Sequence, residues 1–168
     1  MNENILPLII SAFAFLVSII TFFMVKSRKE IPPPPDNFSS RPLQLQAYER
    51  IAMLAERISI PNLVSRASQQ ADLSSREMRL LLLESIKQEY EYNASQQIYV
   101  TPVAWEAIKN LKDQNMLIIN QVASTLPDDA RGIDMNRRLL EFTMSQPKGQ
   151  LHTVVLEALN YEAKKLMK

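Results

Sequence analysis

The pattern of apolar and polar residues divides the chain into three parts, and the first is the most apolar. Residues 5–25 form a run of 21 residues with no charge and almost no polar side chain. A helix of this length spans roughly 31 Å at about 1.5 Å per residue, which matches the hydrocarbon core of a bilayer. The pattern therefore predicts a transmembrane helix at residues 5–25, within an N-terminal anchor of residues 1–28.

A cleaved signal peptide is the alternative for this apolar run. The leader MNEN contains Glu3 but no Lys or Arg, and the run is longer than the apolar region of a signal peptide, so a retained helix is favoured. Lys26, Arg28 and Lys29 follow it. Under the positive-inside rule they place the N-terminus outside and the C-terminal domain in the cytoplasm. We therefore expect a single-pass protein of the cell inner (plasma) membrane.

Residues 29–42, KEIPPPPDNFSSRP, have neither helical nor strand periodicity. Their four consecutive prolines favour the extended polyproline II conformation. The segment is predicted to be a Pro-rich spacer between the anchor and the following domain. A ligand for an SH3-like or WW-like domain is the alternative, although it lacks a positioned flanking motif.

From residue 43 onward every strong period is helical. Apolar residues recur at spacings of three and four, as in Tyr48, Ile51, Ala55 and Ile58. Further helices are predicted at residues 78–93, 102–124, 133–144 and 151–166, and SSRE at 74–77 forms a capping box before the first of these. PNLVSR at 61–66 is predicted as a short turn, because the residue before a proline is biased out of the helical region. The fold class is therefore all-α, with a four- or five-helix bundle in residues 43–168.

Two features of these helices predict how they pack. The leucine run at residues 80–83 presents a wide apolar face, which is typical of core packing. Asn115 lies on the apolar stripe of its helix, where a hydrophobic residue is expected. A buried Asn can fix helix register or mark a polar pocket, and a hydrogen-bonded core Asn is favoured here.

The composition removes the residues on which most catalytic and metal sites depend. The chain has no Cys, two Gly, and one His, His152. Thiolate nucleophiles, Cys or His-rich metal sites and Gly-rich phosphate loops therefore lack their side chains. The Gly-x-Ser-x-Gly elbow and the Glu-x-x-His motif of di-iron bundles are also absent from the sequence. We expect a protein that is not an enzyme and has no catalytic residue, no metal and no cofactor.

The charge balance bears on the partners of the predicted bundle. Four of the 19 basic residues and three of the 18 acidic residues precede residue 43, so the remainder carries no formal net charge. Nucleic-acid binding requires a positive face, and it is not expected. The predicted partners are the lipid bilayer, through residues 5–25, and a protein that the sequence does not identify.

Two Glu-Arg pairs repeat at a spacing of seven residues, Glu49-Arg50 and Glu56-Arg57. The spacing aligns them along one face of the first bundle helix, beside its apolar stripe. A solvated edge with weak ion pairs is one interpretation. A docking edge for a partner helix is the other, since Arg is enriched at protein interfaces.

The stretch NASQQIYVTPVAWEAIKN, residues 93–110, joins two predicted helices. Asn93 is expected to end one helix, residues 95–100 to cross over, and Thr101-Pro102 to begin the next. Its aromatic residues can lock the junction to the bundle or serve as anchors of a binding surface. If it is a binding surface, the residues expected to contact a partner are Gln96, Gln97, Tyr99 and Trp105.

The segments LQLQAYERIAMLAERISIPNLVSR and EYNASQQIYVTPVAWEAIKN carry a resemblance to a known family. Over residues 43 to about 125 the chain resembles an uncharacterised bacterial family of short proteins. The resemblance implies one N-terminal transmembrane helix and a helical cytoplasmic domain. It implies no activity, cofactor or catalytic residue.

Together these features predict a membrane-anchored cytoplasmic helical module that acts by interaction or tethering. A membrane anchor confines the attached domain near other membrane proteins and so raises its effective concentration there. The alternative is a self-associating structural membrane protein. It would form a homo-oligomer through the transmembrane helix and the Glu-Arg edge of the first bundle helix.

Overall fold

The computed structural model describes residues 40–70, 72–145 and 151–167, and also residues 14, 15, 18–20 and 22. All the named elements in this described part are helices, and the sole β-type pairing in it is an isolated bridge between Ser74 and Arg131. The prediction of an all-α fold is confirmed. Residues Ser40–Lys168 form one compact unit, which holds the helices named below.

The predicted transmembrane segment falls mostly outside the described residues. The six described residues between positions 14 and 22 are helical and exposed. Among the residues that the structure describes, no helix combines the length and the apolar character needed to cross a bilayer. The predicted spacer lies outside the described part up to Ser39, and its last two residues, Arg41 and Pro42, begin the first helix of the bundle.

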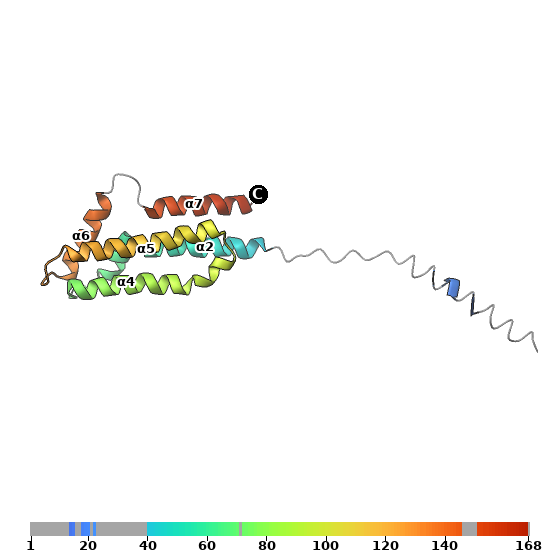
Figure 1. The fold of residues 1–168 in the computed structure, drawn as a ribbon, viewed down its shortest axis with the longest axis horizontal. Coiled ribbons are helices and arrows are strands. Elements are labelled where there is room, and N and C mark those ends of the chain that lie inside the picture. Colours follow the sequence, from blue (N-terminus) through green and yellow to red (C-terminus); the bar gives the residue numbers. More distant parts are fainter. Residues whose placement is uncertain are drawn as a thin grey trace, which may run out of the picture. The chain divides into compact units, whose positions relative to one another are not determined.

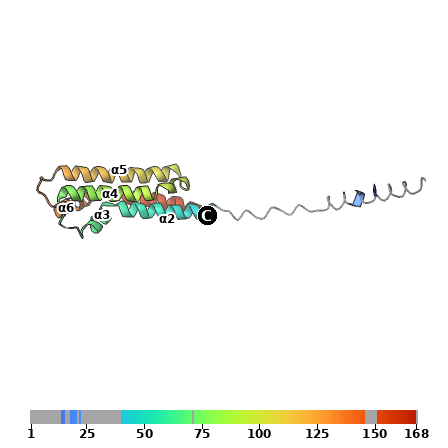
Figure 2. The ribbon, with the colours of Figure 1, turned by 90° about the horizontal axis from the view of Figure 1, so that it is seen from below.

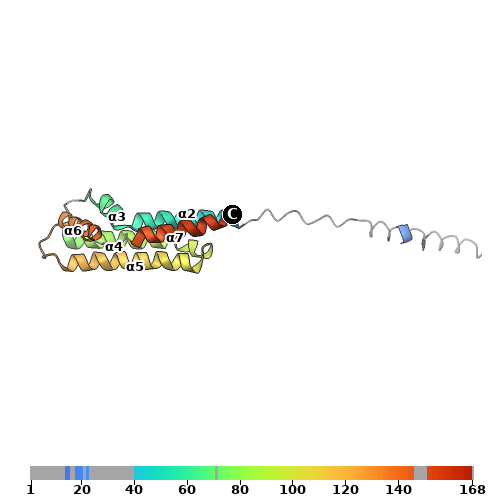
Figure 3. The ribbon, with the colours of Figure 1, turned by 90° about the horizontal axis from the view of Figure 1, so that it is seen from above.

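Four long helices of this unit run side by side, and two shorter helices lie at one end of it (Figure 1). Views from below and above show the same arrangement (Figures 2 and 3). The long helices are α2, α4, α5 and α7, and the short ones are α3 and α6. A 3₁₀ helix, η1, joins α4 to α5. The bounds are α2 Arg41–Ile58, α3 Ile60–Ala67, α4 Ser75–Tyr92, η1 Ala94–Ile98, α5 Pro102–Ser124, α6 Gly132–Met144 and α7 Leu151–Leu166.

The described residues of the bundle form six α-helices, one more than the upper number expected, because the predicted turn at residues 61–66 is wrong. These residues belong to α3. Ser59 takes the extended conformation between α2 and α3, so the chain breaks there and Pro61 falls in the first turn of the new helix. A first-turn proline costs no backbone hydrogen bond, because the first N–H groups of a helix have no partner within it. Burial of Leu63 and Val64 then fixes α3 on the core.

The core lies between α2, α4 and α5 and is closed by α6 and α7. Its largest fully buried side chains come from five of the helices: Ile51, Leu54, Ile58, Met78, Leu82, Ile86, Ile108, Leu111, Ile119, Met135, Leu139 and Leu159. Of the leucine run, Leu82 is 1% exposed and Leu81 and Leu83 pack at the margin of the core, whereas Leu80 is 57% exposed. Core packing is therefore confirmed for three of the four leucines.

Two polar features predicted from the sequence are present. Asn115 is buried, and its Nδ2 donates to the backbone oxygen of Ile58 at 2.8 Å, so a core Asn satisfies the last carbonyl of α2. The capping box at the start of α4 is complete, with Ser74 Oγ accepting from the Glu77 N–H at 3.3 Å. Donation from the Ser74 hydroxyl, and then from its backbone N–H, lowers the pKa of Glu77.

The starts of α4 and α6 are joined backbone to backbone. The Gly132 N–H donates to the Leu73 oxygen at 2.7 Å, and the Ser75 N–H donates to the Ala130 oxygen at 2.9 Å. This close approach leaves no room for a side chain at position 132, since a Cβ there would lie 2.9 Å from the Leu73 oxygen. Glycine at the first position of α6 is therefore a packing requirement.

Candidate docking groove

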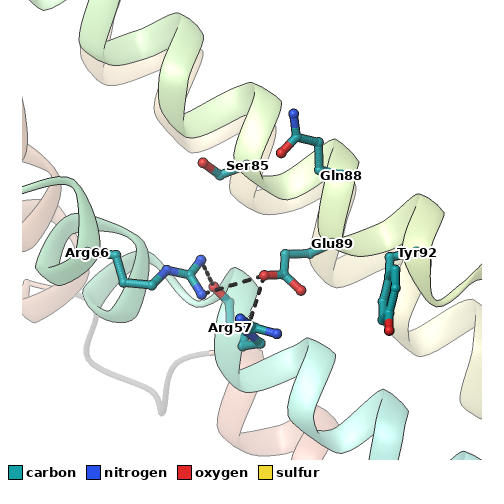
Figure 4. A pocket seen from close by; sticks show the side chains of 6 residues that line it. All are labelled: Arg57, Arg66, Ser85, Gln88, Glu89 and Tyr92. Carbon is teal, nitrogen blue, oxygen red and sulfur yellow. Dashed lines mark hydrogen bonds and ion pairs between the residues drawn. The ribbon is translucent and has the colours of Figure 1, made fainter.

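An open groove lies where the end of α2, the helix α3 and the outer face of α4 meet (Figure 4). Its volume is about 440 Å³. Each of the three helices contributes polar side chains to it. The residues that line it are Arg57 of α2, Arg66 of α3, and Ser85, Gln88, Glu89 and Tyr92 of α4.

Two guanidinium groups converge on one carboxylate in this groove (Figure 4). Arg57 Nε lies 3.1 Å from Glu89 Oε1, and Arg66 Nη1 lies 3.7 Å from the same oxygen. Arg66 Nη2 also donates to the backbone oxygen of Arg57 at 2.8 Å. The cluster joins three helices and carries a net charge of +1.

The exposure of this cluster differs between its members. The Glu89 side chain is 17% exposed, but the side chains of Arg57 and Arg66 are 52% and 42% exposed. A guanidinium has five N–H donors. The contacts above engage Nε of Arg57, and on Arg66 they engage Nη2 in a hydrogen bond and Nη1 in a longer ion pair. The groove therefore offers solvent-facing donors in the fork geometry that binds carboxylates.

The α4 side of the groove follows one helical stripe. Ser85, Gln88, Glu89 and Tyr92 are spaced at i, i+3, i+4 and i+7, which places them on a single face of α4. Tyr92 ends this stripe with 75% of its surface exposed. Exposed Tyr beside Arg is the combination found at the energetic centres of protein interfaces.

Comparison with known proteins gives a family for the chain but no function. A model of a family of unknown function, DUF7935, matches residues 2–166. The chain belongs to this family. The match covers more of the chain than the resemblance at residues 43 to about 125 implied, because it reaches both ends. No curated protein and no solved structure was found to be similar to the chain.

The Glu-Arg repeat of this DUF7935 chain does not form one uniform edge. Glu49, Arg50, Glu56 and Arg57 are all exposed on α2. Arg57 belongs to the groove, and Glu56 meets α3, where Asn62 Nδ2 donates to its backbone oxygen at 2.8 Å and lies 3.3 Å from its Oε2. Glu49 and Arg50 are not among the residues that line the groove. The second pair is therefore engaged at the corner between α2 and α3.

The junction at residues 93–110 is partly a structural clasp. Trp105 is half-buried, and its ring lies 5.2 Å from the ring of Tyr90 at an angle of 32°. Lys112 Nζ lies 4.6 Å from the centre of the Tyr90 ring. These contacts favour the structural interpretation for Trp105.

The helix boundaries of the junction are as predicted, and its crossover is helical. Asn93 ends α4 as expected, and Thr101 Oγ1 caps α5 by accepting from the Ala104 N–H at 3.1 Å. The crossover contains the 3₁₀ helix η1, which the sequence did not predict. Gln96 is half-buried, whereas Gln97 and Tyr99 are exposed, the latter by 38%.

A polar network that the sequence did not indicate joins α2, α5 and α7. The Tyr48 hydroxyl donates to Glu162 Oε2 at 2.6 Å, and Thr101 Oγ1 donates to the same oxygen at 2.6 Å. The Thr101 N–H donates to the Tyr48 oxygen at 3.3 Å. Burial, and secondly the hydrogen bond to Glu162, raises the pKa of Tyr48. The network holds α7 on the bundle beside η1.

The raised pKa of Tyr48 predicts a loss of stability in alkali. Because the folded state favours the neutral phenol, its stabilising effect is complete below the ordinary pKa of 10.0 and is lost as the pH rises through the higher folded value. The free energy of unfolding should therefore fall above about pH 10. Tyr48→Phe should flatten this fall in urea titrations across pH 8 to 11, and Tyr161→Phe on the exposed face of α7 should not. Equal profiles for both variants would contradict the role of the network.

Charged side chains elsewhere in the described ranges do not gather into a metal-binding group. Within residues 40–70, 72–145 and 151–167, no three His, Asp or Glu side chains come close enough to hold an ion. His152 is half-buried near the start of α7.

Proposed function

We propose that this DUF7935 protein is a membrane-anchored docking module that tethers a partner protein through an acidic segment held in the groove. The observation that carries the proposal is the sharing of the Glu89 carboxylate by Arg57 and Arg66. One carboxylate neutralises one of the two cations, and the remaining donors face solvent. A carboxylate from a partner can take these donors as a bidentate ligand.

The shape and chemistry of the groove favour a peptide segment over a small substrate. The groove is open, it lies on three helices, and it ends in the exposed ring of Tyr92. An acidic side chain over the guanidiniums, with an apolar neighbour on Tyr92, would use both features. Such a contact would hold the partner without catalysing a reaction, and we propose that the protein has no catalytic activity.

The membrane part of the proposal rests on the sequence of residues 5–25. That run is uncharged and long enough to span a bilayer, and three basic residues follow it. We propose a single-pass anchor in the inner (plasma) membrane of a bacterium, with the N-terminus outside and the bundle in the cytoplasm. The anchor would confine the groove to two dimensions and raise its effective concentration near membrane partners.

Charge reversal at Arg66 tests the docking role of the groove. The tagged full-length chain is cross-linked in native membranes as wild type, Arg66→Glu and the matched control Arg50→Glu, which reverses an exposed Arg of α2 outside the groove. We expect the yield of the cross-linked partner to fall at least about tenfold for Arg66→Glu, because an acidic segment would then meet a second carboxylate beside Glu89 in place of a guanidinium. Arg50→Glu should keep the wild-type yield.

Two results of this experiment would contradict the proposal. Equal yields for Arg66→Glu and Arg50→Glu would show that the groove does not hold the partner. A cross-link to a second copy of the chain alone would support the self-associating alternative. Circular dichroism of each variant controls for folding, because Arg66 also contacts the end of α2.

A further inference from the structure

The end of the bundle that carries η1 exposes apolar side chains on a loop without charge. Residues 93–105 contain no Asp, Glu, Lys, Arg or His. Ile98 is 71% exposed and Val103 is 72% exposed, beside the 38% exposed ring of Tyr99. Exposed apolar side chains that gather at one place on a soluble domain indicate an interaction surface.

Two other chain segments reach the same end. The hydrogen bonds among Tyr48, Thr101 and Glu162 bring the second turn of α2 and the last turns of α7 to the start of α5. All three ribbon views show the start of α2, η1 and the end of α7 at one end of the bundle (Figures 1, 2 and 3). These segments add further exposed apolar residues, Leu43 and Met167. We call this surface the η1 end: Leu43, Ile98, Tyr99, Val103 and Met167.

The charges around the η1 end have a basic excess. Lys164 and Lys165 are exposed in the last turn of α7, where Lys165 Nζ lies 4.3 Å from the centre of the Tyr161 ring, and Arg41 is the first residue of α2. The acidic residues nearby are Glu91, Glu106 and Glu162. Glu106 is paired with Lys109 at 3.5 Å, and Glu162 accepts two short hydrogen bonds. Aliphatic and Tyr side chains flanked by Lys are the combination that enters the headgroup region of an anionic bilayer.

The connection of the chain favours the bilayer as the occupant of this surface. α2 begins at the η1 end, and residues 26–40 are all that separates its start from the predicted transmembrane run. Fifteen residues span at most roughly 54 Å whatever their conformation. An anchored chain therefore keeps the η1 end within that distance of the membrane surface at all times.

We propose that the η1 end rests on the anionic lipid surface, with Ile98, Tyr99 and Val103 in the headgroup region and the α7 lysines over lipid phosphates. This inference rests on the proposed membrane anchor. It adds an orientation to the proposed function. Arg57 lies 16 residues beyond Arg41 on α2, so the groove would be held about 24 Å along that helix from the contact surface.

Spin labels test this contact directly, because the chain has no cysteine and each introduced Cys is the sole labelling site. The full-length chain is labelled as Ile98→Cys, Val103→Cys and the control Ser124→Cys, an exposed residue about 32 Å from Val103 along α5. Each is measured in detergent, in phosphatidylcholine vesicles and in vesicles that also contain phosphatidylglycerol. The measurement compares two collision rates of the spin label, one with oxygen, which partitions into lipid, and one with a water-soluble nickel chelate.

We expect the nickel collision rate at positions 98 and 103 to fall severalfold in phosphatidylglycerol vesicles relative to detergent, and that at 124 to stay constant. Lys164→Glu combined with Lys165→Glu should return the label at 98 to the aqueous value. A chain that fails to float with vesicles would overturn the anchor and this inference together. A floating chain whose labels at 98 and 103 stay aqueous would overturn the inference alone. Shielding that is equal in detergent and vesicles would also overturn it, because a protein would then cover the η1 end.

Discussion

Leu82→Ala is expected to lower the free energy of unfolding by about 2–5 kcal/mol. Leu82 is 1% exposed and belongs to the hydrophobic core cluster, so its truncation removes buried surface and leaves a cavity that the packed helices fill only in part. The same helix carries Glu89 and Tyr92 of the groove. Loss of this side chain should therefore weaken both the bundle and the groove that depends on the position of α4.

Leu80→Ala is the matched control for this prediction. It makes the same substitution two residues earlier on α4, at a side chain that is 57% exposed. Its free energy of unfolding should change by no more than about 0.5 kcal/mol. Urea titrations of the two variants, followed by circular dichroism, give the comparison. Similar losses for both would show that α4 does not bury the face described here.

Gly132→Ala is expected to destabilise the protein by about 1–3 kcal/mol. A Cβ at this position would meet the Leu73 oxygen at 2.9 Å and the side chain of Met78 at 3.0 Å. The backbone oxygen cannot move without stretching its hydrogen bond from the Gly132 N–H, so α6 has to withdraw from the start of α4. Replacement of Gly by Ala at a site that accepts the Cβ stabilises a protein by about 0.4–1 kcal/mol. A loss of stability would therefore indicate the clash at position 132, and a gain would indicate that there is none.

The measurement for Gly132→Ala is the midpoint of thermal or urea unfolding. Ile133→Ala, at the neighbouring and 44% exposed position of α6, controls for the general effect of a substitution in this turn. A stabilised Gly132→Ala variant would show that the two helix starts do not approach as closely as the structure has them.

The sequence predicted those parts of the fold that depend on neighbours along the chain. The capping box at Ser74 and the cap at Thr101 follow from residues at most three positions apart, and both are present. The burial of Asn115 also follows from local periodicity. The helix α3 was missed because the bias of the residue before Pro61 out of the helical region is a local rule. The burial of Leu63 and Val64, which overrides it, depends on residues elsewhere in the chain.

The candidate site could not be predicted in full, because its members are distant in sequence. Arg57 was identified from the Glu-Arg repeat, but its partner Glu89 is 32 positions away and on another helix. Tyr48 and Glu162 are separated by 114 positions. The polar stripe from Ser85 to Tyr92 was visible as i, i+3, i+4 and i+7 spacing on α4, and it was the signal that could have indicated the groove.

A photoreactive residue at position 92 tests the central claim most directly. The full-length chain carries p-benzoylphenylalanine in place of Tyr92, or in place of Tyr161 as an equally tyrosine-derived control that is 62% exposed on α7. Irradiation in native membranes should join position 92 to an acidic segment of another protein, and Arg66→Glu should abolish that product. Position 161 should give none. Equal products from both positions, or no product from position 92, would contradict a docking role for the groove.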